Sequence, residues 1–410
     1  MNKNIKLAVA GAVLALSATA ANAGIIIPAG DWTVDIGGNV NSFVTSTKQS
    51  GNLRVEGRED TPVMIQTGLL PSALGIGAKT RQNDLDVGVQ FSFFMGSNAN
   101  SGDGLNPGRA HENGGLGYNS LNIRQSYLTF GDKSWGSVLV GRNLGVYGSD
   151  AILSDMTLLG VGSGAGAAGS STLGRIGSGY IYADWKAQIA YTTPNFNGLS
   201  AVVAITEPSG NIDNSQLGYE GKVNFDFGSG DTTGKIWLGG KHMDIQTAAT
   251  GATRAATTGA ADTANAGTVT DHTAEAFDFG GKVANGGAEV VAYYYTGKNV
   301  DQGAGFAINT AQTNTADFRQ RDNHGGYIQG TYKLPGVGTK LGLSYGKSVR
   351  ERNATAADVD AEREAWVVGA YHPLTKHVNI VAEFNSLDIT AHANTTGKAQ
   401  TGSLGAILFF

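Results

Sequence analysis

The stretch that decides the fold is Leu85-Asp86-Val87-Gly88-Val89-Gln90-Phe91-Ser92-Phe93. Its odd-numbered residues are apolar, and its even-numbered residues are polar or glycine. Successive side chains of a β-strand point to opposite faces of the sheet, so one face of this strand suits lipid and the other suits water. The alternation therefore predicts a strand of a membrane-embedded sheet.

About sixteen segments of this kind follow one another along the chain. They form pairs that are joined by tight connections, such as residues 81–84, and long polar loops separate the pairs. An even number of strands is typical of bacterial single-chain membrane barrels. The predicted strands are 32–44, 72–80, 85–95, 121–130, 136–142, 181–192, 199–206, 216–227, 234–244, 275–283, 288–297, 326–334, 339–348, 364–372, 377–386 and 401–410.

The last of these strands can close the ring only by pairing with the first, residues 32–44. Closure leaves no open edge and satisfies every backbone donor and acceptor inside lipid. The sequence thus predicts an all-β protein, a 16-stranded antiparallel transmembrane β-barrel with short periplasmic turns and long external loops. A soluble β-sandwich or β-helix also has alternating inner faces, but the regular exchange of tight turns and long loops favours the barrel.

The first residues predict export. Lys3 and Lys6 precede an apolar run from Leu7 to Leu16, and a small-residue cleavage site ends at Ala23. This is the pattern of a secretory signal peptide over residues 1–23, which leaves one domain over residues 24–410. An uncleaved membrane anchor is the alternative. Such an anchor needs about 20 apolar residues, and the run from Leu7 to Leu16 is shorter. We therefore expect a location in the outer membrane of a Gram-negative bacterium.

Composition excludes several function classes. The 410 residues contain no cysteine, which rules out a disulfide framework and a cysteine nucleophile, and the formal net charge of -5 argues against a nucleic-acid partner. The seven histidines are scattered without metal-ligand spacing. Residues 164–169 match Gly-x-Gly-x-x-Gly, but they lie in an Ala/Gly/Ser tract with no βαβ unit around it. We expect no cofactor and no bound metal.

Three stretches carry a resemblance to a known family: residues 124–130 leading to 135–142, residues 190–199, and the terminal Phe410 at the end of an alternating strand. They resemble the Gram-negative general porins, over essentially the whole mature chain. The resemblance implies an outer-membrane diffusion porin, usually a homotrimer, that passes small hydrophilic solutes and ions without any reaction. It also implies that the third external loop, Asn143 to Tyr180, folds inward as a constriction.

Two arginines are candidates for the pore constriction. Arg124 lies on the strand face opposite Ile123 and Tyr127, so we expect it to point into the lumen. Arg142 occupies the glycine-arginine position of the family. Simple alternation nevertheless places Arg142 toward lipid or headgroups, unless a bulge changes the facing.

Acidic and basic side chains complete the candidate set. Asp150 and Asp155 are the acidic residues of the inward loop and are further constriction candidates. Charges of both signs on the lumen wall would set a transverse field that orients dipolar solutes. By alternation, the lumen-wall candidates are Asp35, Asp86, Lys186, Glu220, Lys222, Lys282 and Glu383.

Aromatic residues on the apolar face indicate contact with the two membrane interfaces. Two other functions remain open at this point: an outer-membrane barrel enzyme with its active site at the rim, and an adhesin or sheath that holds a partner. Neither is supported by a motif. The aromatic residues expected on the lipid face are Tyr127, Trp185, Tyr191, Phe225, Phe227, Tyr294, Tyr332, Tyr345 and Trp366.

Overall fold

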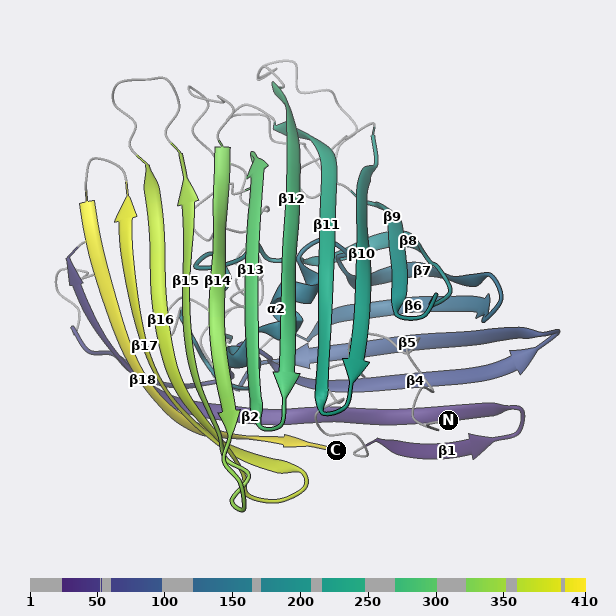
Figure 1. The fold of residues 1–410 in the computed structure, drawn as a ribbon, viewed down its shortest axis with the longest axis horizontal. Coiled ribbons are helices and arrows are strands. Elements are labelled where there is room, and N and C mark those ends of the chain that lie inside the picture. Colours follow the sequence, from purple (N-terminus) through teal and green to yellow (C-terminus); the bar gives the residue numbers. More distant parts are fainter. Residues whose placement is uncertain are drawn as a thin grey trace, which may run out of the picture.

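Sixteen antiparallel strands form the closed wall of a barrel (Figure 1). The computed structural model describes residues 24–51, 53, 60–97, 121–163, 171–207, 216–247, 270–300, 322–351, 360–391 and 395–410. Around the ring, each strand is hydrogen-bonded to the next in chain order. The wall strands are β2 (Trp32–Gly51), β4 (Ser72–Gln82), β5 (Leu85–Met95), β6 (Asn122–Asp132), β7 (Gly136–Leu144), β8 (Trp185–Thr192), β9 (Leu199–Thr206), β10 (Gly218–Ser229), β11 (Thr232–Thr247), β12 (Thr270–Asn285), β13 (Ala288–Lys298), β14 (Asp322–Lys333), β15 (Lys340–Arg350), β16 (Ala361–Pro373), β17 (Val378–Ala391) and β18 (Thr395–Phe409).

The ring closes where the last strand meets the first, as the sequence predicts. β18 pairs with β2 from Phe409 opposite Asn39 to Gly397 opposite Gly51. The terminal residue extends this ladder, because Gly38 N donates to Phe410 O at 2.9 Å and Phe410 N donates to Gly38 O at 3.0 Å. Closure supplies both strands with partners on both edges, which the interior of a bilayer requires.

Two short strands that the sequence pattern does not reveal complete the seam. β1 (Ile25–Ala29) pairs with Trp32–Ile36 of β2, beside the C-terminal end of β18 (Figure 1). β3 (Val63–Gln66) pairs with Phe43–Ser46, farther along β2. Strands of four or five residues carry too few alternating positions to stand out from a loop. The region that the sequence predicts as one long loop, residues 46–71, therefore contains part of β2 and all of β3.

Turn chemistry explains the tight connections. Asn83 and Asp84 have φ angles of 48° and 63°, the left-handed conformation that a two-residue hairpin turn needs, and Asn and Asp tolerate it. The turn is thus shorter than the predicted residues 81–84. At the opposite end, the connection between β17 and β18 spans only residues 392–394, so this external connection is short.

A bulge in β6 changes which residues face inward. Ser92 pairs with Gln125 but Phe93 pairs with Ile123, so Arg124 is the extra residue. Arg124 and Gln125 are consequently both buried on the inner side, and Tyr127 is buried at 8% exposure instead of facing lipid. The prediction for Tyr127 was wrong because simple alternation cannot register an inserted residue.

The outer surface is apolar, as expected. Phe225, Tyr294, Tyr332, Tyr345 and Trp366 are all exposed on it. Trp185 departs from the prediction, because its ring packs 5.5 Å from that of Phe94, an inward-facing residue. Among the described residues, no helix is long and apolar enough to cross a bilayer.

Candidate functional site: the loop inside the barrel

The described residues of the connection between β7 and β8 lie inside the barrel. They contain α2 (Ser149–Ser154), which Figure 1 shows behind the front wall, and η2 (Met156–Leu159). The segment Asn143–Tyr180, which the sequence predicts as the inward loop, is here called the inner loop, and its first two residues still belong to β7. Its described residues make hydrogen bonds to the inner faces of β10, β11, β14, β15, β16 and β17.

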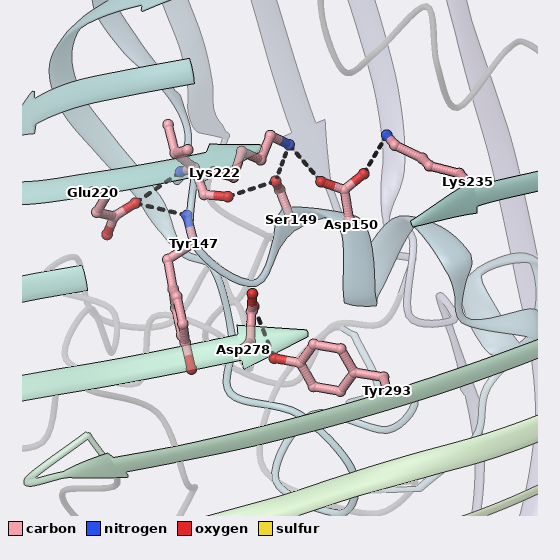
Figure 2. Close-up of polar contacts among 9 residues, drawn as sticks. Tyr147, Ser149, Asp150, Glu220, Lys222, Lys235, Asp278 and Tyr293 are labelled. Atoms are coloured by element: carbon pink, nitrogen blue, oxygen red, sulfur yellow. Dashed lines mark hydrogen bonds and ion pairs between the residues drawn. The ribbon is translucent and has the colours of Figure 1, made fainter. Parts of the chain in front are cut away.

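Glu220 on β10 fastens the first part of the inner loop. Its Oε2 accepts hydrogen bonds from the backbone N–H groups of Val146 at 2.7 Å and Tyr147 at 3.0 Å (Figure 2). Its Oε1 accepts a hydrogen bond from Lys186 Nζ, and Lys241 Nζ lies 3.9 Å from the same oxygen. The carboxylate and both lysines are buried, and the ion pair supplies the compensation that a buried charge needs.

Glu383 on β17 fastens the second part in the same way. Its Oε2 accepts from the backbone N–H groups of Val161 and Gly162, both at 2.8 Å, and its Oε1 accepts from Tyr371 Oη at 2.7 Å. A side chain at Gly160 would collide with this carboxylate, so the loop needs a glycine there. Glu220 and Glu383 therefore bind the loop backbone, and neither faces water as the lumen-wall prediction assumed.

Asp150 on α2 connects the inner loop to two lysines of the wall (Figure 2). Its Oδ2 lies 2.7 Å from Lys222 Nζ, and its Oδ1 lies 2.5 Å from Lys235 Nζ. Lys222 also donates to Ser149 Oγ at 2.8 Å. Burial raises the pKa of the Asp150 carboxyl, but the two ammonium groups outweigh burial and lower the pKa to about 2. The prediction that Lys222 lies inside the barrel agrees with this ion pair.

Asp155 holds the loop together internally. It caps η2 by accepting from Thr157 N at 2.9 Å, and its other oxygen accepts from Tyr180 Oη at 2.8 Å and Arg175 N at 3.2 Å. The carboxylate is buried. Asp155, a constriction candidate from the sequence, thus lies within the inner loop and stabilises its conformation through buried hydrogen bonds.

Arg175 is an anchor that sequence reasoning missed. Its guanidinium is fully buried, and it donates to Ser344 Oγ at 2.5 Å and to Ala365 O at 2.9 Å on the wall. Burial lowers the pKa of this guanidinium, and Asp155 opposes that effect. The signal that could have identified it is local: Arg175 is the only basic residue between Asn143 and Tyr180.

Apolar packing fills the space between the inner loop and part of the wall. Trp237, Tyr293 and Tyr327 point inward and pack with Tyr147 and Tyr180 of the loop in one buried cluster. The ring centroids of Tyr180 and Tyr327 lie 5.8 Å apart. This part of the interior is packed, so water can reach only the remaining part of the lumen.

Arg124 lies inside the barrel, as the sequence predicts, but it is buried at 4% exposure. Its guanidinium carbon lies 4.7 Å from the ring centroid of Phe94 and 5.9 Å from that of Trp185. This is the geometry of a cation–π contact. Arg124 therefore sits on the inner wall, stacked on two aromatic rings.

Arg142 lies outside. It is exposed, and it pairs with Ser126 and Ala187, which are also exposed, so no bulge turns it inward. Its position two residues before the end of β7 suits the headgroup level, where an arginine costs little. The geometry is contrary to a constriction role for Arg142.

The remaining candidates lie away from the inner loop. Asp86 is exposed near the short turns, where it pairs with Arg81 at 2.8 Å. Asp35 and Lys282 are half-buried on the inner face, and Lys282 makes no ion pair within the described ranges. In the part of the chain that the structure describes, no group of three His, Asp or Glu side chains could hold a metal. Residues 164–169 and 1–23 lie outside the described residues.

A closed sixteen-stranded barrel with a loop bonded to its inner wall places the chain, by its fold, among the outer-membrane barrels. A family model described as Gram-negative porin matches residues 8–392. The chain belongs to this family, and it is an outer-membrane porin that lets small hydrophilic solutes and ions diffuse passively. The family and the fold point to a channel rather than an enzyme.

Solved structures with the same fold come from several bacteria. The outer membrane channel DcaP of Acinetobacter baumannii is 14% identical, with a TM-score of 0.62 over 95% of this chain and 100% of that chain. An anion-selective porin from Comamonas acidovorans is 15% identical, with a TM-score of 0.58 over 92% and 100% of the two chains. Outer-membrane expressed OmpT of Vibrio cholerae is 15% identical, with a TM-score of 0.57 over 94% and 100%. No match is found among curated protein sequences.

Proposed function

We propose that the inner loop is the constriction of the pore and that it limits the size of the solutes that pass. The observation that carries this proposal is the pair of carboxylates on distant strands: Glu220 and Glu383 each accept two consecutive backbone N–H groups of the loop. Hydrogen bonds to charged groups are stronger than neutral ones. A loop held in this way narrows the lumen permanently instead of folding outward.

Shortening the loop tests this proposal. Deletion of residues 149–174 should raise the single-channel conductance in a planar bilayer and admit larger sugars in a liposome-swelling assay. Deletion of residues 250–265, from another external connection, is the control and should leave both readouts unchanged. An unchanged conductance and size limit in the first variant would refute the assignment.

We also infer that the protein is a homotrimer and that copies meet through β18, β2 and β4. Outward positions of these strands carry small or aliphatic side chains, such as Val44, Ile76 and Leu404, while the exposed aromatic residues named above lie on β10 and β13 to β16. Aromatic side chains mark contact with lipid interfaces. Chemical cross-linking of the detergent-solubilised protein should give a species of three chains, and a monomer alone would contradict this.

Two further features belong to this proposal. Residues 1–23 are removed during export, so the intact mass of the membrane protein should correspond to a chain that starts at Gly24.

The purified protein should hydrolyse neither lipid nor peptide substrates, because its buried carboxylates are engaged in holding the loop. Lipase or protease activity that survives purification would favour a barrel enzyme instead. A membrane that stays sealed after insertion of the protein would favour an adhesin or sheath.

A further inference from the structure

Inward-facing side chains differ sharply in exposure around the barrel. Along the middle of β12 to β17 they are buried, whereas β5 to β7 carry a row of half-buried positions that is interrupted by the buried Tyr127 and ends at the buried Ser92 and Gln125. The buried set includes Asp278, Val291, Tyr293, Tyr327, Gln329, Ser344, Val367, Val381 and Glu383. The half-buried row consists of Gly88, Gln90, Thr129, Ser137, Leu139, Gly141 and Asn143.

The inner loop causes this difference. Gln329 on β14 accepts from Met156 N at 3.0 Å and donates to Ser154 O at 2.7 Å, and Tyr327 donates to Ala151 O at 2.8 Å. These hydrogen bonds hold the loop against the β12 to β17 side, and apolar packing also places Val146 in a cluster with Leu139 of β7 and Val161 in a cluster with Phe94 of β5. The half-buried positions of β5 to β7 that lie beside this packing mark the open part of the lumen.

On β5 to β7 the half-buried row carries no charge, while Lys79 on β4 lies opposite Gly88, and Asp35 on β2 lies opposite Gly77, the partner of Gln90. The polar groups of β5 to β7 at this level are amides and hydroxyls that bond to one another: Gln90 Nε2 donates to Ser92 Oγ at 3.2 Å, and Ser92 Oγ donates to Gln125 Oε1 at 2.6 Å. Gln125 Nε2 donates in turn to Asn143 Oδ1 at 2.8 Å. Arg124 on the same wall is buried against aromatic rings.

Charges elsewhere on the inner face are of both signs. Lys222 and Lys235 share Asp150. Arg81 pairs with Asp86 and Asp132 at the short turns. The other inward charges near the short turns that are at least partly exposed are Lys79, Lys282, Lys333 and Lys340 against Asp35, Asp226 and Glu289. Charges of both signs in nearly equal number give neither anions nor cations a strong advantage.

We propose that solutes pass along β5 to β7 and that Gln90, on the β5 side of this uncharged row, lies on their path, so that a charge placed there changes the ion selectivity of the pore. The pore then sorts solutes by size and hydrogen bonding, favours neutral polar molecules, and discriminates weakly between cations and anions. This inference rests on the proposed constriction by the inner loop.

Opposite charges placed at one position test the path. In a planar bilayer with a potassium chloride gradient, the wild-type protein should show a reversal potential close to zero. Gln90→Glu should shift it toward cation selectivity and Gln90→Lys toward anion selectivity. Both shifts should shrink at 1 M salt, where the screening length falls to about 3 Å. Ser229→Glu and Ser229→Lys are the matched controls at an exposed position of the barrel rim and should shift nothing.

The outcomes separate this inference from the proposed constriction. Equal reversal potentials in both Gln90 variants, with conductance intact, would overturn the path along β5 to β7 even if the loop deletion enlarges the pore. A strongly selective wild-type channel would overturn the claim of nearly balanced charges. If the Gln90 variants shift the reversal potential as expected but the loop deletion leaves the size limit unchanged, the assignment of the inner loop as the constriction would be overturned instead.

Discussion

Single carboxylates on the inner wall act as anchors for backbone, and this role depends on what each oxygen accepts. Glu383 receives two loop N–H groups and one tyrosine hydroxyl, and in the described residues no ammonium or guanidinium group lies within ion-pair distance of it. Glu220 receives two loop N–H groups as well, but Lys186 compensates its charge. The two anchors are therefore alike in geometry and different in electrostatics.

Removal of the Glu383 charge should loosen the second part of the inner loop. Glu383→Gln turns one acceptor oxygen into a donor, and each buried group left without a partner costs about 1 to 3 kcal/mol. We expect noisier single-channel currents and faster uptake of large sugars. Glu289→Gln, an inward glutamate outside the anchors, is the control. Currents as quiet as those of the wild type would show that Glu383 is dispensable.

The Asp150 ion pairs should give the loop a defined acid sensitivity. The pKa of this carboxyl lies near 2, below its ordinary value of 3.8, so the stabilisation is complete above about pH 4 and is lost as the pH falls toward 2. The contribution is on the order of 2 kcal/mol. The conductance of the wild type should change as the pH falls through this window, because the loop loses these ion pairs. Asp150→Asn should abolish that change, while Asp226→Asn should keep it. Identical pH profiles for the wild type and Asp150→Asn would contradict the expectation.

At the scale of elements, η2 and β15 are close enough to be joined. A side chain at Gly342 would lie 2.6 Å from Met156 Sδ, and the chain contains no other cysteine to interfere. The double variant Gly342→Cys with Met156→Cys should form a disulfide after mild oxidation. Because the loop is already fastened, the oxidised and reduced channels should conduct equally. A drop in conductance on oxidation that dithiothreitol reverses would mean that the loop moves during conduction.

The bulge in β6 shows what one inserted residue does to an element. It brings Arg124 and Gln125 to the same side and turns Tyr127 inward. Beyond the bulge the strand alternates regularly again, with Leu128 and Phe130 exposed on the outer face. A single extra residue therefore decides the facing of every later side chain in the strand.

At the scale of the whole molecule, closure between β18 and β2 should be essential. Ser403 lies in β18 between partners on both sides, Glu383 on β17 and Thr45 on β2. Ser403→Pro removes a ladder donor, and an unsatisfied backbone group in lipid costs several kcal/mol. We expect loss of the folded, heat-modifiable band in gel electrophoresis. Ile27→Pro in β1, which pairs with a single neighbour and already contains Pro28, should be tolerated.

The sequence by itself determined the wall of this barrel. Strand number, the apolar outer face and the closing pair follow from alternation and turn residues, because the two-residue repeat of a strand is a local property of the backbone. Alternation also placed Lys222, Glu220 and Glu383 on the inner face correctly.

Only the tertiary structure decided how the interior is used. Val161 and Glu383 are 222 residues apart in the chain, and nothing local in either segment encodes their contact. The anchoring role of Glu220, Glu383 and Arg175, the inward turn of Tyr127 and the outward position of Arg142 depend on which strands surround the loop and on one bulge. Contacts of this kind arise from packing between distant segments, so a pattern read along one strand cannot contain them.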